Sequence, residues 1–179
     1  ELEKMGTDRG KADAIRTRLT RTISEKSKED PAYYKKFSTR IEETIEAYRN
    51  RRITDSEYLQ KMQDIKEDFR KGNSGISYPT NITTENSRAF YGVIYDKLIP
   101  RMKENANIEE IGEITLTIQR EIESKIKRDW HYNTDIHNEI AQAIDDTIFM
   151  YATRKNISLD LEELDKLIEE IINIALMKY

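Results

Sequence analysis

The sequence IEEIGEITLTIQREIESKI, residues 108–126, decides the fold class of this chain. One set of its side chains recurs at intervals of three and four residues, which is the period of one face of an α-helix. The set consists of Ile108, Ile111, Thr115, Ile118, Ile122 and Ile126. Residues 114–118 alternate briefly as a strand would, but the sequence on both sides keeps the helical period. The segment therefore predicts a helix with one buried face.

The same period continues outward in six further segments, three before 72 and three after 83. Several begin with a helix-start signal, which is an oxygen-bearing N-cap, a proline in the first turn or a capping box. These signals are Asp30-Pro31, Thr54 with Glu57, Thr84, and Asp160 with Glu163. With no period-two segment of useful length, the chain predicts an all-α fold. We expect a globular bundle of about seven helices, with mostly antiparallel neighbours because the connections are short.

Composition agrees with one helical domain spanning residues 1–179. Only 6 glycines and 3 prolines interrupt a chain that is 36% charged and 37% hydrophobic. The stretch 72–84, with Gly72, Gly75 and Pro79, is the best internal lobe boundary. The chain starts with Glu1-Leu2-Glu3 rather than methionine, so we expect it to be the C-terminal part of a larger subunit.

Cysteine is absent, which excludes disulfides and thiolate metal sites and favours a reducing compartment. No apolar run approaches the roughly 20 residues that a helix needs to cross a bilayer. We therefore expect a cytoplasmic protein without a membrane partner.

Catalytic patterns are missing from the sequence. His131, Asp135 and His137 are the best metal-ligand candidates, but the two histidines lie six residues apart and so fall on different helix faces. No phosphate-binding loop, dinucleotide-binding turn or nucleophile elbow occurs. We expect no catalytic centre, no metal and no cofactor in this part of the subunit.

Charge is unevenly distributed along the chain. The net charge is −4, but residues 129–179 carry 4 basic and 11 acidic side chains, whereas residues 11–71 carry 16 basic and 12 acidic ones. Arginines of the first two helices are candidates for phosphate contacts. They are Arg16, Arg18, Arg21, Arg49, Arg51 and Arg52. The alternative is a solvated helix surface, because helix surfaces are usually charged.

Five blocks of the sequence resemble the C-terminal region of the motor (R) subunits of type I restriction-modification enzymes. They are GTDRGKADAI (6–15), EDPAYYKKFSTRIEETI (29–45), RRITDSEYLQKM (51–62), SRAFYGVIYDKL (87–98) and RDWHYNTDIHNEIAQAIDD (128–146). The pattern D-P-x-[FY]-Y-x-x-F-S at 30–38 is the most specific of them, and the resemblance spans most of the chain.

The resemblance implies a parent subunit with a nuclease domain and two helicase-like domains that use ATP and Mg²⁺ to translocate DNA. Motifs of those domains are absent here. The C-terminal region would dock the motor domains of the same chain onto the methyltransferase core subunits and help to hold double-stranded DNA by its backbone. We expect assembly with auxiliary DNA binding; the alternative is a purely structural brace without DNA or partner contact.

Two surfaces follow from this expectation. The six arginines would contact phosphates independently of sequence along one edge of a groove. The acidic last third, around Trp130, Asp145 and Asp146, would form the protein-interaction face because its charge repels DNA. Trp130 is the only tryptophan, and a tryptophan at an element boundary is more often a packing anchor than a binding platform.

Overall fold

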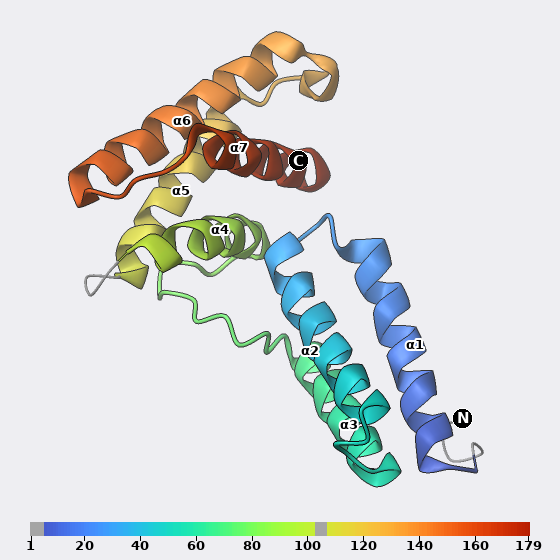
Figure 1. The fold of residues 1–179 in the computed structure, drawn as a ribbon. Coiled ribbons are helices and arrows are strands. Elements are labelled where there is room, and N and C mark those ends of the chain that lie inside the picture. Colours follow the sequence, from blue (N-terminus) through green and yellow to red (C-terminus); the bar gives the residue numbers. More distant parts are fainter. Residues whose placement is uncertain (1–5, 103–106) are drawn as a thin grey trace. The chain divides into compact units, whose positions relative to one another are not determined.

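The computed structural model describes residues 6–102 and 107–179, which form seven α-helices, two short 3-10 helices and no strand (Figure 1). The prediction of an all-α fold with about seven helices is confirmed. The segment Glu1-Leu2-Glu3, on which the expectation of a cut chain rested, lies outside the described residues. The chain divides into two compact units, each described separately below. Unit 1 comprises residues 1–27 and 33–76, and unit 2 comprises residues 28–32 and 77–179.

Unit 1 consists of three helices that run in alternating directions along the chain (Figure 1). They are α1 (Asp8–Lys26), α2 (Pro31–Arg49), whose first two residues are counted with unit 2, and α3 (Asp55–Lys71). Because directions alternate, α1 and α3 are parallel to each other, and these two pack together.

The core of unit 1 is rich in aromatic side chains. Its buried members are Ala12, Ile15, Leu19, Ile23, Phe37, Ile41, Tyr58, Met62 and Ile65. Phe37 lies 5.0 Å from the ring of Tyr33 and 5.1 Å from that of Phe69, centroid to centroid. Tilted and edge-to-face pairs of this kind are favourable beyond the area that they bury.

Local signals fix both ends of α3. The Thr54 backbone N–H donates to Glu57 Oε2 at 2.7 Å, and the Glu57 N–H donates to Thr54 Oγ1 at 3.3 Å, which completes the predicted capping box. Gly72 ends the helix with φ 74°, a left-handed conformation that glycine adopts without steric cost.

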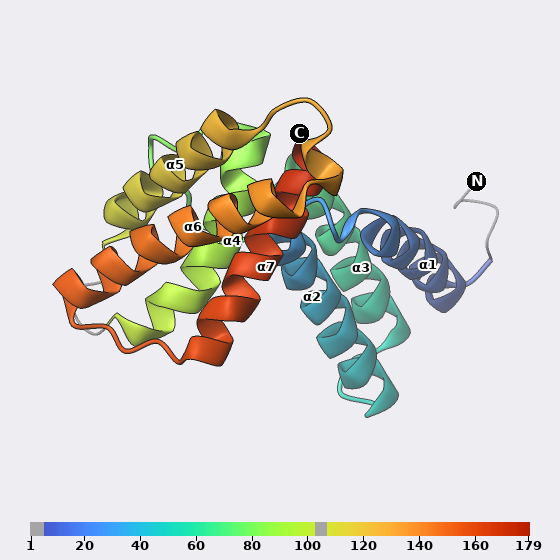
Figure 2. The same cartoon turned by 90° about the horizontal axis from the view of Figure 1, so that it is seen from above.

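Unit 2 contains four helices in a closed ring. They are α4 (Glu85–Leu98), α5 (Ile108–Lys125), α6 (Thr134–Lys155) and α7 (Leu161–Lys178), with the 3-10 turns η2 (Ile99–Arg101) and η3 (Trp130–Tyr132) between them. Helices α4 and α6 each pack against both α5 and α7 (Figure 2). Pro100 lies in η2, directly after the end of α4, as its position predicted.

Isoleucine dominates the interior of this ring. Buried isoleucines come from all four helices: Ile94, Ile111, Ile114, Ile118, Ile122, Ile136, Ile140, Ile144, Ile148, Ile171 and Ile174. Gly112 of α5 lets the segment before α4 approach closely, because a Cβ at this position would lie 2.5 Å from Asn81 Oδ1 and 2.7 Å from Pro79 Cγ. The helical stripe at 108–126 thus faces the core, as its period indicated.

The start of α7 differs from the prediction. Asp160 is the N-cap, but its carboxylate accepts from the Glu162 backbone N–H at 3.4 Å. Glu163, expected to complete a capping box, instead accepts from the Arg101 guanidinium of η2. The ion pair between two elements has replaced the local contact, and no signal in the sequence indicated this partner.

None of the described helices combines the length and apolar character that crossing a membrane requires.

Candidate functional site

Three of the predicted arginines lie together at the end of α2. Arg49 is its last residue, and Arg51 and Arg52 follow in a turn that ends the helix. The Arg52 N–H donates to the Ala47 carbonyl at 2.9 Å, and the Arg51 N–H donates to the Tyr48 carbonyl at 3.0 Å. This pattern is a Schellman motif with Arg51 in the left-handed position at φ 53°.

This arginine trio, Arg49, Arg51 and Arg52, is exposed. Within 6–102 and 107–179, no carboxylate lies at ion-pair distance from any of the three. Their charge is therefore available to an anionic partner.

The turn that carries the trio is held by a polar and aromatic network. The Tyr48 and Tyr58 rings stack with centroids 4.4 Å apart. The Tyr48 hydroxyl donates to Asp55 Oδ1 at 2.8 Å, and this bond raises the pKa of Tyr48. The Tyr58 hydroxyl donates to Asp13 Oδ1 at 3.2 Å. These contacts connect α1, α2 and α3 next to the turn that carries the trio.

Arg9 was not among the predicted residues, yet it lies at the same end of unit 1. Its guanidinium carbon is 6.0 Å from the centroid of the Tyr48 ring, and its Nε is 3.8 Å from Asp13. It stands just after the start of α1, far from Arg49 in sequence, so only the antiparallel packing of α1 and α2 brings it there.

The α1 arginines lie in different surroundings. Arg16 Nη1 lies 3.2 Å from Asp13 Oδ1, and Arg21 Nε lies 2.9 Å from Glu25 Oε1. Arg18 lines a small hollow of about 110 Å³ between α1 and α3, opposite Lys66. Each residue turns a helix by about 100°, so Arg18 and Arg21, three positions apart, leave α1 on the same side, whereas Arg16 leaves it on the other side.

The predicted protein-interaction residues also differ in exposure. Trp130 is 2% exposed, with its ring centroid 4.8 Å from that of His131 and 5.6 Å from that of His137. It packs inside unit 2 and offers almost no contact surface. Asp145 is half-buried on a flank of α6, whereas Asp146 is exposed.

The indole Nε1 of Trp130 and Nε2 of His137 are buried, and neither has a hydrogen-bond partner among the described residues. Asp135 and His131, the other two candidate ligands, are exposed. Among the described residues no group of three histidine or acidic side chains is arranged to hold a metal ion.

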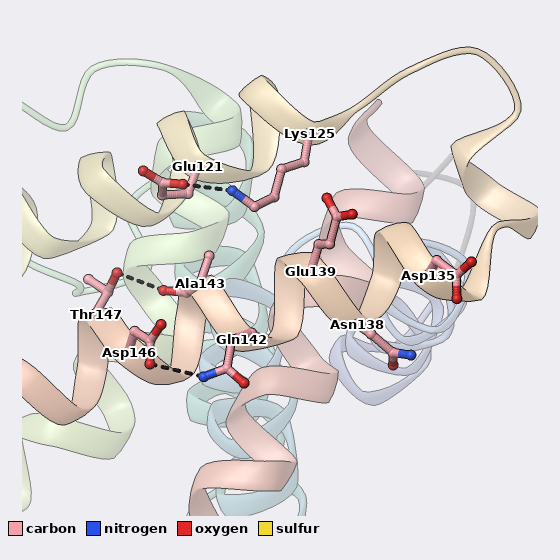
Figure 3. A pocket seen from close by; sticks show the side chains of 9 residues that line it. All are labelled: Glu121, Lys125, Asp135, Asn138, Glu139, Gln142, Ala143, Asp146 and Thr147. Carbon is pink, nitrogen blue, oxygen red and sulfur yellow. Dashed lines mark hydrogen bonds and ion pairs between the residues drawn. The ribbon is translucent and has the colours of Figure 1, made fainter.

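A shallow groove of about 730 Å³ runs between α5 and α6 (Figure 3). Four carboxylates line it: Glu121 from α5, and Asp135, Glu139 and Asp146 from α6. Lys125 Nζ lies 2.8 Å from Glu121, and the Gln142 amide donates to Asp146 Oδ1 at 2.9 Å. The α6 side of the groove therefore keeps a negative charge that no lining lysine or arginine pairs with.

An ion-pair network holds the other end of α6. Lys155 Nζ lies 2.6 Å from Glu110 Oε2, and the Tyr151 hydroxyl donates to the same oxygen at 3.3 Å. The hydrogen bond from Lys155 lowers the pKa of Glu110. Burial, together with the Glu110 carboxylate, raises the pKa of Tyr151 to about 12.

Charge follows the structural division. Unit 1 contains 17 lysines and arginines against 13 aspartates and glutamates, whereas unit 2 contains 13 against 21. The resulting charges are about +4 and −8. The imbalance noted along the sequence is therefore a difference between two separately packed bodies.

A family model described as "Type I restriction enzyme HindI endonuclease subunit-like, C-terminal" matches residues 1–175, which include both units. No curated protein and no solved structure matches the chain.

Proposed function

Because the chain belongs to the family of C-terminal domains of type I restriction enzyme endonuclease subunits, we propose that it joins the motor to the rest of the enzyme. In this proposal unit 2 docks on the methyltransferase core subunits, and unit 1 adds contacts to the backbone of double-stranded DNA. The chain itself contributes no catalytic step, and ATP and Mg²⁺ act in the preceding motor domains. The enzyme works in the cytoplasm.

The observation that carries the proposal is the opposite charge of the two units. A body with a net positive charge, whose arginine trio forms no ion pair with any described carboxylate, attracts phosphates. A body with 21 acidic side chains repels DNA and suits a protein surface of opposite charge.

We also rank the arginines by their existing ion pairs. Among the described residues no carboxylate is ion-paired with Arg49, Arg51 or Arg52, so phosphate contacts there displace no ion pair. Arg16 and Arg21 already pair with Asp13 and Glu25 and would have to exchange one anion for another. We therefore assign the main contribution to the trio and a smaller one to Arg16, Arg18 and Arg21. None of these contacts reads bases, so they position DNA without specifying its sequence.

Charge reversal in the complete endonuclease subunit tests the DNA contact. Arg51→Glu with Arg52→Glu should weaken binding of unrelated duplexes equally, whereas Arg16→Glu with Arg21→Glu should have a smaller effect. Both pairs change the charge by the same amount, so each controls for the other. Unchanged duplex binding in both variants would contradict the proposed DNA contact.

Removing the chain tests the assembly role and its alternative. Methyltransferase core and DNA are titrated against the complete subunit and against a subunit that lacks residues 1–179. We expect the shortened subunit to lose stable association with the core. If the complex forms with unchanged affinity, the domain is a structural brace without a partner.

A further inference from the structure

The outer face of α6 is exposed in the described part of unit 2. We define it as Asp135, Glu139, Gln142, Asp146, Phe149 and Met150. At about 100° per residue these positions fall within an arc of about 100°, opposite the buried isoleucines of the same helix. The outer face is therefore one continuous strip about 22 Å long, given a rise of about 1.5 Å per residue.

Two large apolar side chains occupy one end of this strip. Phe149 is 64% exposed and Met150 is 71% exposed. Two adjacent large apolar groups cost free energy in water unless a partner covers them. The other end carries the carboxylates of Asp135, Glu139 and Asp146, which border the α5–α6 groove (Figure 3).

We propose that the outer face of α6 is the docking surface for a basic amphipathic helix of the methyltransferase core. This inference rests on the proposed assembly role and assigns it to one surface. Charge complementarity selects the occupant, because three carboxylates at spacings of four and seven residues match lysines or arginines along one side of a partner helix.

The partner's dimensions follow from those of the strip. A length of about 22 Å corresponds to about four turns of helix. Its apolar side chains would cover Phe149 and Met150, and its cations would lie over the groove. Double-stranded DNA is a poor occupant, because its phosphates would face the same carboxylates.

The test uses the complete endonuclease subunit and purified methyltransferase core, with association measured as an equilibrium constant. One variant carries Phe149→Ser and Met150→Ser, and a second carries Glu139→Lys and Asp146→Lys. The matched control carries Asp165→Lys and Glu169→Lys, which change the charge equally at exposed positions of α7 outside the groove. Circular dichroism and a thermal unfolding profile that match those of the unaltered subunit establish that each variant is folded.

We expect both outer-face variants to bind the core about ten-fold more weakly or worse, and the control to stay within about two-fold of the unaltered subunit. A photo-crosslinking residue in place of Phe149 should label a lysine- or arginine-rich helix of the core. Core binding by either outer-face variant at the strength of the control overturns the proposal, as does a crosslink only to DNA or to an acidic segment.

The subunit lacking residues 1–179 distinguishes a failure of the assembly role from a failure of the outer face of α6 as its docking surface. If it loses core binding while the outer-face variants keep it, the assembly role stands and this surface is the wrong one. If it binds the core normally, both proposals fail.

Discussion

The two units differ in how much of each kind of side chain they bury. Unit 1 packs the rings of Phe37 and Tyr58 into a small aliphatic core, whereas unit 2 buries isoleucines from four helices together with the larger rings of Trp130, Phe90 and Tyr91. Three helices enclose less volume than four, so unit 1 has the smaller interior. Four helices with recurring isoleucines interdigitate along their length. The lesson is that each unit has its own interior, so its surface charge can serve a separate partner.

Core truncation should give the largest effects and test this independence. Phe37→Ala in unit 1 should lower the free energy of unfolding by about 3–5 kcal/mol, and Ile140→Ala in unit 2 by about 2–5 kcal/mol. Trp130, the only tryptophan, is buried in unit 2, so its fluorescence reports that unit. Hydrogen exchange follows both units.

The first variant should accelerate exchange in unit 1 and leave the urea midpoint of Trp130 fluorescence in place. The second should shift that midpoint. Equal shifts of the midpoint in both variants would show that the two interiors unfold as one.

Adding a methyl group at Gly112 should give the next largest effect. Alanine in place of a helical glycine usually stabilises a helix by about 0.5–1 kcal/mol, but here its Cβ would meet Asn81 Oδ1 and Pro79 Cγ at 2.5 and 2.7 Å. We expect Gly112→Ala to destabilise unit 2 by about 1–3 kcal/mol. A double-mutant cycle with Asn81→Ala, read by chemical denaturation, should recover part of the loss; a stabilised single mutant would contradict the close approach.

The sequence predicted the features that depend on neighbouring residues and missed those that depend on contacts between distant segments. Helical period and cap residues placed all seven helices, and Thr54 with Glu57 formed the expected box. Glu163 failed as a capping residue because Arg101, 62 positions away in the sequence, offered a better partner. Pairings of this range leave no local pattern in a single sequence.

The proposed surfaces show the same limit. The arginines of the trio were predicted because they cluster in sequence, whereas Arg9 reaches the same end only through helix packing. For the outer face of α6, the sequence predicted only the acidic charge around Asp146. Its apolar end at Phe149 and Met150 was missed, because a large apolar residue in a helix is assigned to the core by default.

Ion pairing should contribute less than packing, and in a pH-dependent way. The pKa of Glu110 is lowered by Lys155, so its stabilisation is complete above the ordinary pKa of about 4.3 and disappears as the pH falls through the lowered value. Glu110→Gln should destabilise unit 2 by about 0.5–1 kcal/mol at pH 7, with the difference vanishing at strongly acidic pH. Thermal unfolding at several pH values measures this.

Lys166→Gln, which breaks the exposed pair with Glu162 on α7, is the matched control and should change stability less. A Glu110→Gln difference that grows as the pH falls would contradict the assigned sign.

Relief of backbone strain at Arg51 should give the smallest effect. A left-handed conformation costs a residue with a Cβ about 1–2 kcal/mol, and glycine at this position would remove that cost. Glycine also has greater freedom in the unfolded chain, which offsets part of the stabilisation. Arg51→Gly should therefore stabilise unit 1 by about 0.5 kcal/mol while weakening DNA binding. Asn156 of unit 2, at φ 55°, is the comparison: asparagine tolerates this region, so Asn156→Gly should be close to neutral by denaturant unfolding.

The salt dependence of duplex binding is the sharpest test of the proposal that unit 1, rather than unit 2, contacts DNA phosphates. In the complete endonuclease subunit, Arg49, Arg51 and Arg52 of unit 1 are changed together to glutamine and compared with the same change at three exposed cations of unit 2, Lys127, Arg128 and Arg154. Each lost phosphate contact reduces the slope of log affinity against log salt by about 1. We expect a slope reduced by about 3 in the unit 1 variant and an unchanged slope in the unit 2 variant. Equal slopes in the two variants would contradict the proposed contact between unit 1 and DNA.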